Sequence, residues 1–80
     1  MDEKHRDVHG HKVFYAEEAK RGVEYLDSDL DYKEAEVFFR DAKSRGQSAL
    51  EDDDRRNFTL VYNRNGTYSL QLRKESRGWF

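Results

Sequence analysis

An alternation of apolar and polar residues on both sides of one short turn constrains this chain more than any other feature. Successive side chains of a strand point to opposite faces of a sheet, so such an alternation predicts two strands with a shared apolar face. The turn between them contains Asn65-Gly66. The alternating apolar residues are Phe58, Leu60, Tyr62, Tyr68, Leu70 and Leu72.

The length of this turn decides which residues share a face. A two-residue loop would place Tyr62 opposite Ser69 and mix the two faces. A three-residue loop over 64–66, with Gly66 in the left-handed region, places Tyr62 opposite Tyr68 and puts all the large residues on one face. We therefore predict the three-residue loop. The opposite, outward face then carries the uncharged residues Thr59, Val61, Thr67, Ser69 and Gln71.

Two segments upstream have the apolar spacing of helices. The spacing over 31–45 predicts a helix that begins at an Asp31 cap, with Glu34 completing a capping box, and ends at Gly46. A second apolar stripe runs from Tyr15 to Leu30 and predicts another helix. Gly22 lies on that stripe, which indicates a close approach by a neighbouring element.

The remaining segments complete a predicted architecture. Residues 47–50 are expected to form an edge strand, whereas Lys12 to Tyr15 fit either a short strand or the lead-in to a helix. Residues 1–11 are polar and lack periodicity, so we expect a flexible tail before a single domain over 12–80. The predicted fold is a two-layer α+β domain, with two N-terminal helices packed on a small antiparallel β-meander of two to three strands.

Composition narrows the class of protein. The 80 residues are 40% charged, but the net charge of only −2 favours a folded chain over a disordered one. The chain has no cysteine and no apolar run long enough for a membrane span or a secretory signal. We therefore expect a cytoplasmic protein without a membrane partner.

The apparent chemical motifs fail when their requirements are considered. Asp27, Asp29 and Asp31 resemble the start of a calcium loop, but the glycine and the glutamate that such a loop needs are absent. The cluster of His5, His9 and His11 falls in the expected tail, which offers no scaffold for a metal. No nucleophile motif or glycine-rich phosphate loop is present. We expect no enzyme activity, no cofactor and no metal site.

The surface of the predicted hairpin is the better candidate for function. Its charge-poor face with an arginine rim is typical of a protein interface. The sequence therefore predicts a non-catalytic protein-protein interaction module, a small regulator or accessory subunit, that binds through its sheet face and edge. Edge pairing would also favour a homodimer. The expected partner-binding residues are Thr59, Val61, Ser69, Gln71, Arg64 and Arg73.

A nucleic-acid-binding domain that uses the basic C-terminal hairpin is the alternative, because residues 55–80 hold six basic side chains and one acidic one. Trp79 and Phe80 are expected either to fold back over the core or to anchor a partner. The basic residues of the alternative site are Arg55, Arg56, Arg64, Arg73, Lys74 and Arg77.

Overall fold

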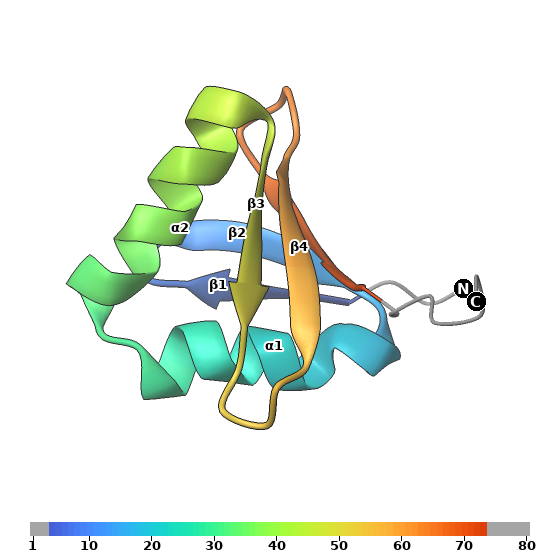
Figure 1. The fold of residues 1–80 in the computed structure, drawn as a ribbon. Coiled ribbons are helices and arrows are strands. Elements are labelled where there is room, and N and C mark those ends of the chain that lie inside the picture. Colours follow the sequence, from blue (N-terminus) through green and yellow to red (C-terminus); the bar gives the residue numbers. More distant parts are fainter. Residues whose placement is uncertain (1–3, 74–80) are drawn as a thin grey trace, which may run out of the picture.

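A five-stranded mixed sheet and two helical segments make up the protein, whose computed structural model describes residues 4–73 (Figure 1). The strand order across the sheet is β1-β2-β5-β4-β3. In Figure 1, β1 and β2 cross steeply behind β3 and β4, while α2 and α1 close the side and the lower end of the core. The strands are β1 (Lys4–Val8), β2 (His11–Tyr15), β3 (Gln47–Glu51), β4 (Asn57–Tyr62) and β5 (Tyr68–Leu72).

The predicted antiparallel meander of two to three strands is wrong, because an N-terminal hairpin adds two strands to it. β1 and β2 pair antiparallel through a tight turn in which His9 has φ 51° and Gly10 has φ 90°. The segment expected to be a flexible tail therefore forms, over residues 4–11, strand β1, the turn and the start of β2. Only Val8 of β1 is buried, so this edge strand lacks the apolar alternation that would have predicted it.

The hairpin joins the rest of the sheet through a parallel pairing of β2 with β5. Val13 lies beside Tyr68, and Tyr15 lies beside Leu70. This pairing makes the sheet mixed and places the helices, in chain order, between two groups of strands. The segment Lys12 to Tyr15, which fitted a strand or a helix, lies in β2.

The predicted hairpin register is confirmed. Tyr62 is opposite Tyr68 and Leu60 is opposite Leu70. Asn63 N–H donates to Thr67 O at 2.8 Å and closes a three-residue loop, in which Gly66 has φ 92°. β3 also forms as expected, and it pairs antiparallel with β4 at the edge of the sheet.

The first helical segment is irregular. It consists of a 3-10 turn (Glu17–Ala19), the short helix α1 (Lys20–Glu24) and a π-helical turn (Tyr25–Asp29). Gly22 is buried where this segment crosses the sheet: a Cβ there would lie 2.7 Å from Leu70 Cδ2 and 2.8 Å from the Phe58 ring. The close approach predicted at Gly22 is confirmed.

The second helix, α2 (Tyr32–Arg45), matches its prediction in detail. Asp31 Oδ1 accepts from Glu34 N–H at 2.8 Å, and Glu34 Oε1 accepts from Asp31 N–H at 3.0 Å, so both halves of the capping box are formed. Gly46 ends the helix in the left-handed conformation, with φ 95°. The chain then reverses directly into β3.

The core lies between the inward face of the sheet and the two helical segments. Phe39 of α2 is central: its ring stacks on His11 at 4.2 Å between centroids and meets Tyr68 edge-on at 4.8 Å. Tyr68 Oη donates to Phe39 O at 3.4 Å, and burial raises the pKa of Tyr68. The buried hydrophobic residues are Val8, Val13, Tyr15, Ala19, Val23, Leu26, Ala35, Phe39, Ala42, Leu50, Phe58, Leu60, Tyr68 and Leu70.

Candidate functional site

The residues predicted to face outward from the hairpin do share the outer face of the sheet. Val61 is directly opposite Ser69, and Thr59 is directly opposite Gln71. None of the four is buried, whereas their inward neighbours Leu60 and Leu70 are. Because side chains alternate between the faces, the four lie together on the side of the sheet that carries no helix in residues 4–73.

The outer face extends further than the hairpin. One row of residues crosses all five strands, since Gln47 is opposite Val61, Ser69 lies beside Phe14, and Phe14 is opposite His5. The Phe14 ring contacts His5 at 5.7 Å between centroids, and Lys12 Nζ lies 5.5 Å from its centroid. Phe14 was not predicted as a surface residue, although buried and more exposed positions alternate over Lys12 to Tyr15 in a way that places it on this face.

The predicted arginine rim is divided between the two ends of the hairpin. Arg64 lies in the loop between β4 and β5, whereas Arg73 follows β5 at the far end, where its N–H donates to Asn57 O at 2.7 Å. A strand of the length of β4 spans about 20 Å at 3.3 Å per residue. The arginines therefore do not form one continuous patch within residues 4–73. Lys74, Arg77, Trp79 and Phe80 lie outside the described residues.

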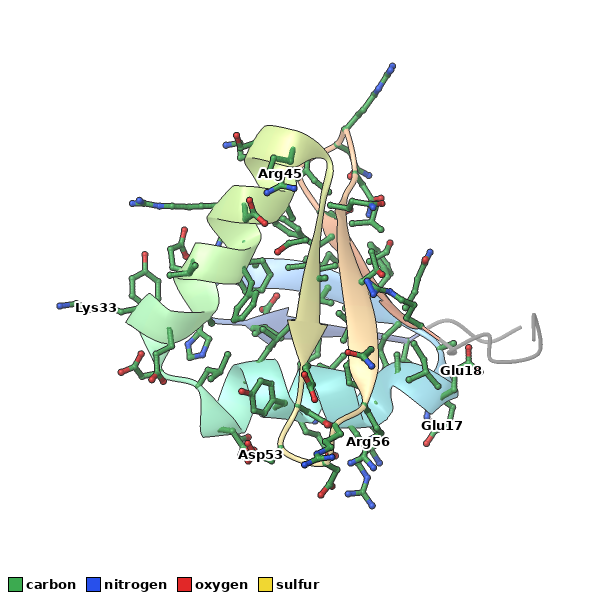
Figure 2. All side chains as sticks on the ribbon, in the orientation of Figure 1. Glu17, Glu18, Lys33, Arg45, Asp53 and Arg56 are labelled. Carbon is green, nitrogen blue, oxygen red and sulfur yellow. The ribbon has the colours of Figure 1, made fainter. Side chains whose placement is uncertain are left out.

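Arg56 is engaged in the turn between β3 and β4. The side chain of Asp52, only 4% exposed, accepts from Arg56 Nε at 3.0 Å and from Arg56 N–H at 2.9 Å. Asp52 also accepts from Asp54 N–H, and Arg56 contacts the Asp54 carboxylate at 2.8 Å. In Figure 2, Arg56 and Asp53 mark this turn, in which Arg55 has φ 66°. The acidic run thus organises a turn, and Arg56 is its internal counterion.

A polar cleft of about 580 Å³ lies beside this turn. It is lined by residues of the first helical segment and by the turn, among them Arg21, Tyr25 and Asp53. Burial raises the pKa of Tyr25, and the negative charges of Asp53 and Asp29 raise it further. Both effects favour the protonated, uncharged form of the Tyr25 phenol.

The three histidines of the expected tail occupy separate environments. His9 Nε2 lies 3.0 Å from Leu26 O and 3.1 Å from Leu30 O, so it carries a proton and donates to the end of the first helical segment. His11 Nε2 lies 3.0 Å from Glu36 Oε1, while His5 is on the outer sheet face. In residues 4–73 no three His, Cys, Asp or Glu side chains are grouped as metal ligands would be.

Within residues 4–73, the edge of β3 offers unpaired backbone groups. Gly46 O accepts from Tyr62 N–H at 3.0 Å, and Asp52 N–H donates to Arg56 O at 3.0 Å, so the even-numbered residues bond toward β4. The bonding direction alternates along an antiparallel ladder. The outward backbone N–H and C=O groups therefore belong to Gln47, Ala49 and Glu51.

Among the residues that the structure describes, no further strand covers this edge. β3 is the last strand of the sheet in the described residues, and the side chains that flank its free backbone groups are all exposed. Glu51 is the only charged residue of the strand, which contains no proline and no bulge. Edges of this kind readily accept another strand. We refer to the outward groups of Gln47, Ala49 and Glu51 as the β3 edge.

A hollow of about 470 Å³ lies between the β3 edge and α2. Val37 and Phe38 supply apolar surface on the helix side, and Ser48 and Ala49 line the strand side. Val37 is 65% exposed and Tyr32, at the start of α2, is 57% exposed. These two are the exposed large apolar residues in the described part of the chain. Both thus lie on the helix that flanks the unpaired strand.

The opposite edge of the sheet is protected. β1 carries Lys4, Arg6 and Asp7 in five residues. Lys4 contacts the Glu17 carboxylate at 2.9 Å and Arg6 contacts Asp27 at 3.4 Å, so the strand is tied to the first helical segment. Charged residues discourage pairing between edges. The two edges therefore differ, and only the β3 edge combines unpaired groups with an apolar surface in residues 4–73.

Comparisons with known proteins provide no relative from which a function can be transferred. No helix in residues 4–73 has the length and apolar character that crossing a bilayer requires. No protein-family model, no curated protein and no solved structure matches the chain.

Proposed function

We propose that this chain is a non-catalytic protein-interaction module that accepts an extended strand of a partner polypeptide at the β3 edge. The observation that carries the proposal is the set of unpaired backbone groups of Gln47, Ala49 and Glu51 beside the hollow lined by Val37 and Phe38. Strand addition of this kind takes its affinity from main-chain hydrogen bonds and its specificity from the alternate side chains of the added strand.

The surroundings of the β3 edge support this function. A strand added there would continue the rows of the outer sheet face, where Ala49 adjoins Thr59 and Gln47 adjoins Val61. Its side chains on the other face would reach the hollow beside α2, where apolar contact adds to the hydrogen bonds. Thr59 and Val61, which were predicted to bind a partner, therefore lie directly beside the proposed binding edge.

Proline substitution tests the proposal without disturbing the native ladder. The Ala49 N–H points away from β4, so Ala49→Pro removes one outward donor and leaves the β3–β4 hydrogen bonds in place. Short peptides selected from a displayed random library on the wild-type chain serve as the probe. We expect selected peptides to lose at least about tenfold in affinity on Ala49→Pro, because a lost hydrogen bond and the steric effect of the ring act together.

Ala49→Thr is the matched control, since it retains the N–H and favours strand geometry. It should bind the selected peptides within about threefold of the wild type, in keeping with its unchanged backbone donors. Thermal unfolding of both variants verifies that the fold is kept. If the library yields no peptide that distinguishes Ala49→Pro from Ala49→Thr, the β3 edge is not a strand-accepting site and the proposed function is wrong.

A further inference from the structure

The outward backbone groups of the β3 edge are arranged symmetrically about Ala49. We infer that the strand accepted at the β3 edge is β3 of a second copy of this chain, paired antiparallel about a two-fold axis at Ala49. The inference rests on the proposed function, because it uses the same edge. It adds the identity and the register of the partner.

The spacing of the outward backbone groups fits a second copy of the same strand. They occur at Gln47, Ala49 and Glu51, symmetrically about the middle residue. An antiparallel copy centred on Ala49 places Ala49 opposite Ala49 and Gln47 opposite Glu51 of the second copy. Each of these three opposed pairs exchanges two hydrogen bonds, which gives six in total. Every outward group of β3 then has a partner.

The side chains on the outer face also match in this antiparallel pairing. In this register Gln47 lies directly opposite Glu51 of the second copy, and its amide is able to donate to that carboxylate. No two carboxylates lie opposite each other, although each strand carries one. The side chain at the axis is the small Ala49, which is exposed. A directly opposed pair of like charges would have been destabilising, and this register avoids it.

The surface of α2 beside the edge is compatible with the same pairing. A two-fold axis perpendicular to the sheet puts the helices of both copies on the same side, so the two hollows meet next to the axis. Each hollow contains the exposed Val37 together with one cation, Arg40, and one anion, Asp41. The Arg40 side chain is 81% exposed and its contact with Glu36 is long, at 4.0 Å. Two such surfaces present apolar area and balanced charge to each other.

The β1 edge carries several charged residues and the β3 edge only Glu51, and this difference limits the assembly to two copies. Pairing of β3 with β3 uses the same surface on both copies and leaves the charged β1 edges at the two outer ends. An isologous contact of this kind is closed. The expected assembly is thus a dimer with one continuous ten-stranded sheet, twice the five strands of the single chain, and not a filament.

The test begins with sedimentation of the full chain over a concentration series from micromolar to millimolar. We expect a reversible monomer–dimer equilibrium, shifted to monomer by Ala49→Pro and retained by Ala49→Thr. Register is tested by opposite changes at one position: Gln47→Glu puts two carboxylates opposite each other, whereas Gln47→Lys creates two ion pairs. Because two symmetric pairs change at once, the dissociation constant should rise roughly two- to thirtyfold with Glu and fall by a similar factor with Lys.

Cross-linking supplies a readout that does not depend on destabilising the protein. The chain contains no cysteine, so Ala49→Cys introduces a single thiol. Opposed residues of a hydrogen-bonded antiparallel pair have Cα atoms about 5.5 Å apart, within the range of about 4.4–6.8 Å that a disulfide spans. We expect mild oxidation to give a covalent dimer from Ala49→Cys much faster than from Val61→Cys, which lies one strand away from the axis.

The outcomes separate the inference from the function on which it rests. The chain could stay monomeric to millimolar concentration and still bind library peptides in a way that Ala49→Pro weakens. That result would overturn the inference that the partner is a second copy, and it would leave the proposed function in place. A monomeric chain that also binds no such peptide overturns both. A dimer that is indifferent to Ala49→Pro and to the Gln47 substitutions uses another surface and contradicts the inference.

Discussion

Gly22 lies against Leu70 so closely that a Cβ on the glycine would be 2.7 Å from Leu70 Cδ2. Alanine is the better helix former by about 1 kcal/mol, yet Gly22→Ala should destabilise the protein by roughly 1–3 kcal/mol, because Leu70 and the Phe58 ring must both move. Urea unfolding of the two proteins measures the difference. Lys20→Ala, at an exposed position of the same helix, is the control and should change stability by less than about 0.5 kcal/mol. A more stable Gly22→Ala variant would contradict this packing.

Asp52 and Asp53 are adjacent acidic residues, but we expect only the substitution of Asp52 to lower the stability of the fold. Asp52→Ala removes the acceptor for two backbone N–H groups and for the Arg56 guanidinium, and it should cost about 1–3 kcal/mol of unfolding free energy. Asp53 is exposed, so Asp53→Ala should stay within about 0.5 kcal/mol of the wild type. Equal effects of the two substitutions, measured by thermal unfolding, would mean that Asp52 does not organise the turn.

Leu60 and Val61 are neighbours in β4 that face opposite sides of the sheet, so substitutions at the two positions should differ sharply in their effect on stability. Val61→Glu and Ser69→Glu place charges on the outer face and should change stability by no more than about 1 kcal/mol. Leu60 is fully buried, and Leu60→Ala should cost about 2–5 kcal/mol. Loss of folding in Val61→Glu, judged by circular dichroism, would disprove the register.

Alkaline pH should destabilise the protein partly through Tyr68. Burial raises the pKa of this phenol above its ordinary value of about 10, and Tyr62 and Glu36 add to the shift. The unfolded chain therefore loses the Tyr68 proton first, so this contribution to stability is complete below about pH 10 and is lost as pH rises through the folded-state pKa.

Tyr68→Phe should make the fall in stability above pH 10 shallower, whereas Tyr32→Phe, at an exposed position, should not. Unfolding curves at a series of pH values, combined with tyrosinate absorbance of the folded protein, provide the measurement. An identical decline in the wild type and in Tyr68→Phe would show that Tyr68 ionises equally in both states.

The sequence was most informative where structure depends on neighbours in the chain. The capping box of Asp31 and Glu34 and the three-residue loop ending at Gly66 both follow from local chemistry, and both were predictable. The parallel pairing of Val13 with Tyr68 was not, because no local pattern specifies which distant strand lies beside another. β1 was missed since its inward position Arg6 is occupied by a charge that pairs with Asp27.

The candidate site was predictable to a similar extent. The outward positions of Val61 and Ser69 followed from the register. The unpaired groups of Ala49 became visible only with the strand order, because an edge is defined by the strand that is missing beside it. The exposed Val37 was visible in the helix pattern, but its position beside that edge depends on how α2 packs.

The pairing of β2 with β5 also has a consequence for synthesis on the ribosome. Val13 and Tyr68 are 55 positions apart in the chain. Closing the loop between them costs roughly 3–4 kcal/mol of chain entropy. β5 lies between β2 and β4 in the sheet. As the chain emerges from the ribosome, the β1–β2 hairpin therefore has no strand to pair with until β5 has been synthesised. The native sheet is thus completed only after β5 has emerged from the ribosome, and until then the inward apolar residues of β2 have only β1 beside them.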